Sequence, residues 1–290
     1  MLLAPGLELP SDDTWWAELK LDGARGQLRV VDGMPALRTR RGRRCDDEFP
    51  EILRAGEPLP DAVLDGEIVL LDEDGSPDFS ALRARLGIGA TRARSLAKTR
   101  PAVFYAFDVL WYRGRDLRSR PLQERRRVLE GLPFSDAVRL VQTHPGQAAA
   151  VLEFARERLL EGVVVKRADS LYRSGRSTAW RKFKIRHPER VWVTAWRPGG
   201  PGELDRYWVG RSVDGRLIPS GEVSFGLTPG QASTLRNVLR AAELGGRHRN
   251  GLRPVAPVVA MTVASHGRRS GWLRDPVVTA LHLDPKPSSC

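Results

Sequence analysis

Runs of alternating apolar and polar residues predict β-strands in the N-terminal part of the chain. Residues 15–21 alternate in the manner of a half-buried strand. The dipeptide Asp22-Gly23 follows and is typical of a tight turn, so we expect residues 25–31 to return as the hairpin partner. This pattern places Lys20 at the end of a strand, where the backbone would hold it rigidly.

Denser apolar runs predict buried strands further along. Residues 102–111 are rich in β-branched and aromatic side chains, and residues 163–166 form a short apolar run that ends in lysine. Residues 62–71 predict a strand interrupted by a second turn at Asp65-Gly66. Apolar residues at helical spacing predict helices at 49–53, 79–86, 122–132 and 147–160, whereas residues 87–100 predict only a loose connection.

The pattern changes after residue 190 to strands that are separated by turns rich in glycine and proline. Such turns stand at residues 197–203 and 213–216, and one helix is predicted at about residues 229–244. This change predicts a second domain that is built mainly of strands.

Composition and charge limit the classes of function that the chain can have. The 290 residues are 41% hydrophobic and 28% charged, which is enough for one large or two ordinary globular domains. The net charge of +12 makes nucleic acid the first candidate partner, although an arginine-rich proteome would give the same excess. The two cysteines exclude a disulfide framework and a cysteine-based zinc site. No apolar run reaches the roughly 20 residues that span a bilayer, and no signal pattern opens the chain, so we expect a soluble, cytoplasmic protein with no membrane partner.

Several charged residues stand inside or beside the predicted strands. Lys182 and Lys184 share one face of the alternating run 180–185, where two cations repel each other unless an anion such as phosphate lies between them. Glu67 precedes four apolar residues, so its charge requires a hydrogen-bonding or metal partner. Lys20 is either a solvated turn residue or a nucleophile, and a lysine acts as a nucleophile only in its neutral form.

The order of short motifs across residues 20–184 is more informative than any motif alone. The series reads Lys-x-Asp-Gly-x-Arg, Thr-Arg, Asp-Gly-Glu, Phe-Asp, Glu-Gly-Val-Val-Val-Lys and Trp-Arg-Lys-Phe-Lys. It resembles the motif series of ATP-dependent DNA ligases within the covalent nucleotidyltransferase superfamily. The resemblance implies an α+β fold, with a nucleotidyltransferase (adenylation) domain of antiparallel sheets and helices at residues 1–187 and a small OB-fold β-barrel domain at residues 188–290.

The resemblance also implies a covalent mechanism. Lys20 would attack the α-phosphorus of ATP and carry AMP, and Asp22 would position it. Lys182 and Lys184 would flank the α-phosphate. The AMP would then pass to the 5′-phosphate of a break, which the adjacent 3′-hydroxyl would attack, and all of these transfers depend on positioning and charge neutralisation.

The nucleotide and metal contacts follow from the same resemblance. Glu67 would contact the ribose or organise a metal, and Glu161 would bind Mg²⁺, with Mn²⁺ as the alternative. Phe107 would stack on adenine, and Glu18 would read the adenine amino group. The remaining contacts, to the nucleotide or to the 5′-phosphate, would come from Arg25, Arg40 and Arg274.

The last motif departs from the family pattern. Gly271-Trp272-Leu273-Arg274-Asp275-Pro276 resembles it, and Arg274 matches its arginine. Many relatives, however, have arginine where Val277 and His282 stand, and lysine directly after the aspartate where this chain has Asp284-Pro285-Lys286. These departures leave the contribution of the last motif to the first step open.

The expected substrate is duplex DNA with nicks or breaks. The segment Phe49-Pro50-Glu51-Ile52 looks like bacterial end-joining ligases, so a Ku-like end-binding protein and a separate polymerase or nuclease are candidate partners of a monomer at the bacterial nucleoid. Alternatives stay open. RNA ligases and mRNA-capping guanylyltransferases share the lysine motif, and a non-catalytic OB-fold nucleic-acid-binding protein would share the basic charge.

Overall fold

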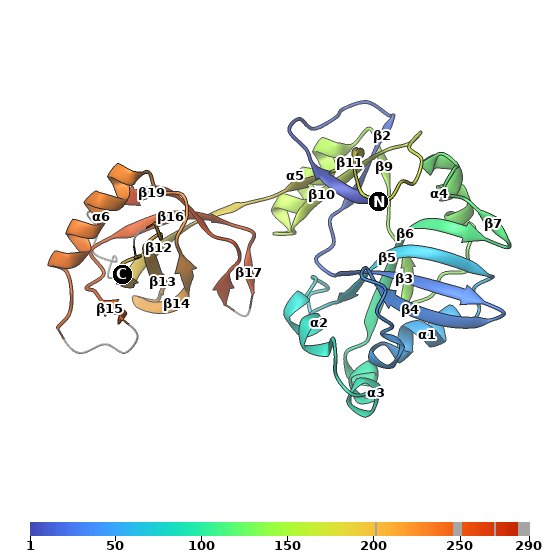
Figure 1. Ribbon diagram of the computed structural model, residues 1–290, viewed down its shortest axis with the longest axis horizontal. Helices are drawn as coiled ribbons and strands as arrows, with labels where there is room; N and C mark the ends of the chain where they lie inside the picture. Colours follow the sequence, from blue (N-terminus) through green and yellow to red (C-terminus); the bar gives the residue numbers. More distant parts are fainter. Residues whose placement is uncertain (201, 246–250, 270, 284–290) are drawn as a thin grey trace. The chain divides into compact units, whose positions relative to one another are not determined.

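The structure is a computed structural model that describes residues 1–200, 202–245, 251–269 and 271–283. The chain divides into two compact units, Met1–Ile185 and Arg186–Cys290, each with its own sheets and core (Figure 1). The sequence placed the domain boundary after residue 187. No helix in the described ranges is long and apolar enough to cross a membrane.

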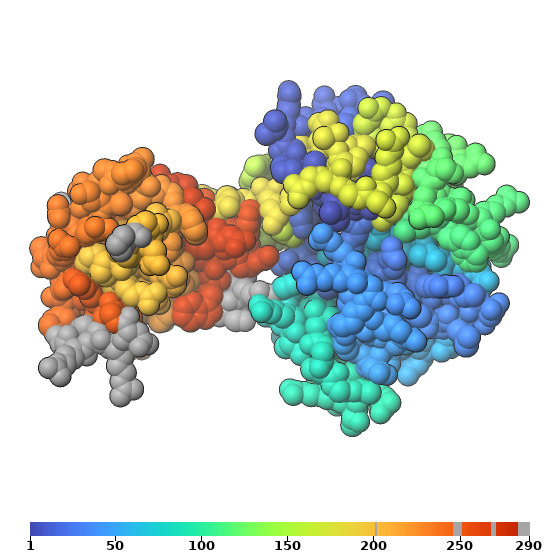
Figure 2. Space-filling model, viewed as in Figure 1, coloured from blue at the N-terminus to red at the C-terminus, as the bar shows by residue number. Residues whose placement is uncertain are grey.

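The first sheet of the first unit brings the ends of the unit together. Its strand order is β1 (Leu2–Pro5), β11 (Arg176–Lys184), β10 (Gly162–Arg167), β2 (Trp15–Leu19) and β9 (His144–Pro145). β1 runs parallel to β11, whereas the other neighbours are antiparallel. Figure 2 shows the result at the surface, where blue N-terminal residues adjoin the yellow residues of the β11 region. Helix α5 (Ala148–Glu157) covers this sheet, because Val151 and Ala155 pack in one cluster with Val163 and Val165.

The second sheet of this unit holds the larger core. Its order is β4 (Met34–Thr39), β3 (Ala24–Val31), β5 (Ala62–Leu70), β6 (Ala102–Tyr112) and β7 (Arg115–Asp116), with β8 (Val138–Leu140) parallel to β6. The elements beside it are the 3₁₀ turn η1 (Asp46–Glu48) and the helices α1 (Pro50–Gly56), α2 (Phe79–Arg85), α3 (Ala90–Thr99) and α4 (Leu122–Glu130). Ile52, Leu82 and Leu129 of α1, α2 and α4 are fully buried against Leu64 and Phe104. One face of the sheet is therefore core, and the alternate residues of its strands point away from that core.

The predicted hairpin of residues 15–21 with 25–31 is wrong. β2 belongs to the first sheet and β3 to the second, so the chain crosses between the sheets at residues 20–23. β3 pairs with β4 and β5 instead. A Cβ atom on Gly23 would lie 2.3 Å from the Ile68 carbonyl oxygen and 2.7 Å from Glu67 Cγ. Gly23 is therefore required where the crossover touches β5, and not for a turn between paired strands.

Two other expectations differ from the structure. β5 runs unbroken through Asp65-Gly66, so no turn interrupts it. Gly66 serves packing, because a Cβ there would lie 2.5 Å from Phe104 Cζ. Helix α3 was not predicted, since Ala93 is its single buried residue and the apolar positions at helical spacing are mostly alanines. The strand predicted at residues 102–111 is confirmed as β6.

In its described residues the second unit is a β-domain with one helix. Its sheet has the order β14 (Arg216–Val223), β13 (Arg206–Val213), β12 (His187–Arg197), β16 (Ala260–Ser265) and β19 (Val277–His282), and β15 (Arg253–Pro254) pairs with β12. β17 (Arg268–Arg269) and β18 (Trp272–Leu273) form a separate pair. The helix α6 (Pro229–Ala241) begins with a capping box of Thr228 and Gln231 and ends earlier than predicted. Its Leu235 and Leu239 are buried in the core with Trp196.

Candidate active site

Lys20 lies at the crossover between the two sheets of the first unit. Its backbone N–H donates to the Gly162 carbonyl at 2.9 Å, which fixes the end of β2 against the start of β10. Its Nζ is 2.7 Å from Oε2 of Glu161, and the other carboxylate oxygen of Glu161 is 2.9 Å from Lys184 Nζ. One buried carboxylate therefore joins two lysines that come from different strands.

Lys182 completes a cluster of positive charge beside this carboxylate. Lys182 and Lys184 alternate along β11 with Phe183 and Ile185, which pack into the core beneath, so the predicted one-sided arrangement of the lysines is confirmed. Burial lowers the pKa of Lys182, and the charges of Lys184 and Lys20 lower it further. Its ammonium group has no ion pair or hydrogen bond within the described ranges. The cluster therefore has an excess of positive charge, which suits an anion such as phosphate.

Glu161 keeps its charge in this cluster. Burial alone would raise its pKa, but the adjacent Lys20 and Lys184 ammonium groups outweigh that effect and lower it. The carboxylate is thus ionised at neutral pH and able to orient both lysines. The expectation of a metal-binding role for Glu161 stays untested, because both of its oxygen atoms contact lysines here.

Glu67, unlike Glu161, has a carboxyl group whose pKa is raised. It lies on β5 beside Gly23 of the crossover, and burial raises the pKa of its carboxyl to about 8. Its side chain has no hydrogen bond or ion pair among the residues that the structure describes. A carboxyl held in this way needs either its proton or a cation. No set of three or more His, Cys, Asp or Glu residues in the described ranges could hold a metal alone, so Mg²⁺ would need further oxygen atoms from a nucleotide and from water.

Arg25 lies on β3 and contacts residues of β5, of β6 and of the loop after β10. Its guanidinium donates to both carboxylate oxygens of Asp65, at 3.1 and 2.6 Å, and to the Tyr172 hydroxyl at 3.3 Å. Burial would lower the pKa of Arg25, but the hydrogen bonds to Asp65 raise it. The guanidinium carbon also stands 5.3 Å from the centre of the Phe107 ring. Asp65 and Tyr172 were not among the predicted site residues, and Tyr172 stands in a loop without any pattern to mark it.

Glu18 and Lys166 form a buried ion pair behind Phe107. Glu18 Oε2 is 2.6 Å from Lys166 Nζ, and these side chains are 5% and 2% exposed. The ammonium group lies 4.4 Å from the ring centres of both Phe107 and Trp180. Burial raises the pKa of Glu18 and lowers that of Lys166, and each charge opposes the effect on its partner. Lys166 was not among the predicted site residues, although a lysine that ends a buried apolar run requires a partner.

The remaining predicted residues are placed as follows. Asp22 lies in the crossover after Lys20. Arg40 follows β4 with its backbone N–H donating to the Arg25 carbonyl at 2.9 Å, and its exposed guanidinium has no partner within the described ranges. Arg274 belongs to the second unit, where its backbone N–H bonds to Gly267. His282, which departs from the family pattern, bonds to Thr262 at 2.9 Å, and residues 284–286 lie outside the described ranges.

The model of the family described as "ATP dependent DNA ligase domain" matches residues 7–184, which include every helix and strand of the first unit except β1. The chain belongs to the ATP-dependent DNA ligase family. The resemblance indicated by the motif order is thus confirmed, and with it the enzyme class. The matched part of this ligase chain contains Lys20, Arg25, Glu67 and the lysines of β11.

Relatives of known sequence support the family over a wider part of the chain. This ligase chain is 32% identical to the "Multifunctional non-homologous end joining protein LigD" of Mycolicibacterium smegmatis, over 94% of the chain but 36% of the relative. It is 37% identical to a "Probable DNA ligase" of Streptomyces coelicolor over 73% of the chain and 44% of that protein. The chain thus spans only about a third to a half of the length of these relatives.

Solved structures confirm the α+β fold. The mycobacterial DNA ligase D complexed with ATP and MES is 29% identical, covers 99% of the chain and 95% of its own, and gives a TM-score of 0.58. A Lig E DNA ligase covers 97% of the chain and 98% of its own with a TM-score of 0.62 at 18% identity, which supports the fold alone. The ligase fold, with an adenylation domain and a second, OB-like β-sheet domain, is therefore confirmed.

Proposed function

We propose that this chain seals breaks with a 3′-hydroxyl and a 5′-phosphate in duplex DNA, and that Lys20 carries AMP between the steps. The observation that supports this most directly is the cluster of Lys20, Lys182 and Lys184 around the single carboxylate of Glu161. A lysine that is rigidly held beside further cations and a proton acceptor has what an attack on phosphorus requires.

In the first step Lys20 Nζ forms a bond to the α-phosphorus of ATP. The bond from that phosphorus to the bridging oxygen breaks, and its electron pair leaves with pyrophosphate. The proton that Nζ must lose passes to Glu161, which accepts it over the 2.7 Å contact in the structure. Lys182, whose ammonium group has no partner in the described ranges, offsets the charge that develops on the α-phosphate.

The other residues would bind the nucleotide, the metal and the DNA. Phe107 would stack on adenine with the pair Glu18–Lys166 at its edge, and Arg25 with Arg40 would contact the nucleotide or the 5′-phosphate at the break. Asp22 would hold the crossover in position. Arg274, on the second unit, would contribute to the first step.

A metal ion fits Glu67 in this mechanism. Mg²⁺, or Mn²⁺ in its place, would screen the charge of the triphosphate when bound. Glu67 would hold it as a carboxylate, because a cation removes the cost of ionising this buried group. Glu161 would join it only after Lys20 releases its oxygen.

The relatives support a proposal about the cellular role. The printed name of the Mycolicibacterium smegmatis relative is that of an end-joining protein, so we infer a role in DNA repair by end joining. A Ku-like end-binding protein and a separate polymerase or nuclease would act with the chain, which would work as a monomer in the cytoplasm at the nucleoid. The net charge of +12 supports binding of duplex DNA that weakens steeply with added salt.

The test uses purified protein, Mg²⁺ and α-labelled nucleotides. We expect covalent label from ATP and not from GTP, and faster sealing of nicked DNA than of nicked RNA. The Lys20→Ala variant should lose both label and sealing, whereas the control Lys98→Ala, an exposed lysine of α3, should keep both. Label from GTP would indicate a capping enzyme, faster sealing of RNA would indicate an RNA ligase, and sealing without Lys20 would refute the covalent mechanism.

A further inference from the structure

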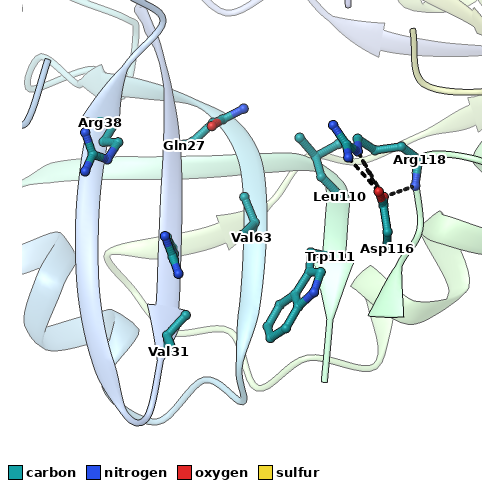
Figure 3. A pocket seen from close by; sticks show the side chains of 9 residues that line it. Gln27, Val31, Arg38, Val63, Leu110, Trp111, Asp116 and Arg118 are labelled. Atoms are coloured by element: carbon teal, nitrogen blue, oxygen red, sulfur yellow. Dashed lines mark hydrogen bonds and ion pairs between the residues drawn. The ribbon is translucent and has the colours of Figure 1, made fainter. Parts of the chain in front are cut away.

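An open groove of about 420 Å³ lies on the second sheet of the first unit, on the face opposite the core (Figure 3). Side chains from β3, β4, β5 and β6 line it, and the segment of Asp116 and Arg118 forms one border. Figure 3 shows Trp111 on β6 and Val63 on β5, Gln27 and Val31 on β3, and Arg38 on β4. The proposed mechanism does not use any of these residues.

The groove continues the face that carries the active site. Arg25, which contacts Asp65 in the site, stands opposite Glu67, and Arg29 stands opposite Val63 on the same two strands. Because side chains alternate along a strand, Arg25, Gln27 and Arg29 point to one face. Four residues of strand measure about 13 Å, which is about the length of four stacked nucleotides at 3.4 Å each.

The floor of the groove is apolar and aromatic. The pairing of β5 with β6 contains a β-bulge: Val63 pairs with Trp111 and Leu64 with Val109, so Leu110 is an extra residue on β6. Leu110 and Trp111 both line the groove. Val31 and Val63 extend the floor. The half-buried Trp111, which pairs with Val63 on one side and with Asp116 on the other, offers a flat surface that a nucleobase can stack on, and such stacking tolerates any base.

The border of the groove is positively charged. Arg29 is exposed, and its guanidinium has no hydrogen bond or ion pair within the described ranges. Arg38 is also exposed and uses one nitrogen to donate to the Gly42 carbonyl at 3.0 Å, which leaves its other donors available. Arg118 is held by Asp116 through several hydrogen bonds and adds no net charge. The two available arginines favour an anionic ligand with a flat apolar part.

We propose that this groove binds single-stranded DNA that continues from the break, with an unpaired base on Trp111 and the backbone phosphates at Arg29 and Arg38. The proposal rests on the proposed function, in which Arg25 would contact the 5′-phosphate at the break. Duplex DNA would fit less well, since its bases are stacked inside and cannot lie on an aromatic floor. The substrates that benefit are DNA ends with unpaired tails of about four nucleotides or more.

The experiment measures binding of 5′-phosphorylated oligodeoxythymidylates of two, four, six and eight nucleotides by fluorescence anisotropy. For the wild type we expect affinity to rise about tenfold between the two-nucleotide and six-nucleotide probes. Trp111→Ala should remove most of this rise, Trp111→Phe should keep it, and Arg29→Gln should reduce affinity for the longer probes. The matched controls are Phe154→Ala, which removes an exposed aromatic paired with Arg158 on α5, and Arg156→Gln on the same helix; neither should change the rise.

The inference is overturned if the wild type binds all probes equally, or if Trp111→Ala keeps the full rise. It is also overturned if Trp111→Ala weakens binding of a blunt nicked duplex as much as that of the six-nucleotide probe, because the groove would then contact duplex DNA. Covalent labelling with α-labelled ATP, without DNA, is measured in parallel. Absence of labelling in the wild type would refute the proposed function. Labelling together with an affinity that does not change with probe length would refute only the binding of single-stranded DNA in the groove.

Discussion

Replacing Glu67 by glutamine should make folding stability less dependent on pH. Burial raises the pKa of Glu67 from 4.5 to about 8. Below pH 4.5 the carboxyl is protonated in both the folded and the unfolded chain. Between pH 4.5 and 8 only the folded chain keeps the proton, so the stability of the wild type falls as the pH rises. At about 1.4 kcal/mol per pKa unit the upper limit is about 5 kcal/mol, and solvent that reaches the partly buried side chain reduces it to about 2 kcal/mol.

The assay is calorimetric melting of the first unit from pH 5 to pH 9 with a chelator present. We expect the melting temperature of Glu67→Gln to rise relative to the wild type by about 4–8 °C over this range and then to level off. Mg²⁺ with ATP should remove the difference at pH 9, because the metal then balances the carboxylate. The control is Glu73→Gln, an exposed carboxylate in the turn after β5. A difference that does not change with pH, or an equal change in the control, would refute the interpretation of Glu67.

Three other substitutions test interactions that hold each of the two units together. Arg125→Ala should destabilise the first unit by about 3–5 kcal/mol in urea unfolding, because it leaves the fully buried Asp108 carboxylate without its partner. Gly23→Ala should abolish AMP labelling while circular dichroism still shows a folded chain, since the new Cβ would displace the crossover from the Ile68 carbonyl; unchanged labelling would contradict the close contact. Thr228→Ala should cost about 1 kcal/mol in the second unit without changing labelling, because it removes the capping box of α6.

The local sequence pattern was sufficient to predict a strand or the face of a side chain where the neighbours of a residue along the chain decide its environment. The alternation in β11 correctly placed Lys182 and Lys184 on one side, because Phe183 and Ile185 had to be buried on the other. The dense apolar run of β6 was read correctly for the same reason. The approach of Lys20 and Lys184 to Glu161 could be expected only from the order of the motifs, since these residues come from separate strands.

The errors arose where tertiary pairing decided the outcome. Asp22-Gly23 has the chemistry of a turn, but the pairing of β3 with β4 and β5 places its strands in different sheets. The need for a glycine there comes from the backbone of β5, which no local pattern reveals. Lys166 was missed because its partner Glu18 lies on a neighbouring strand that is distant in the chain. Helix α3 was missed because the apolar residues at its helical spacing are mostly alanines, and only Ala93 is buried.

The sharing of Glu161 by two lysines has a consequence for the order of events in catalysis. On the proposed mechanism Lys20 loses its positive charge when it becomes a phosphoramide, so the 2.7 Å contact to Oε2 loses its attraction while that to Lys184 remains. One carboxylate oxygen becomes available only after the nucleotide is attached and the proton taken from Lys20 has left Glu161. The charge of Lys20 therefore decides whether one oxygen of Glu161 can contact another group. The adenylated protein thus offers the DNA a different set of ligands from the set that it offers ATP.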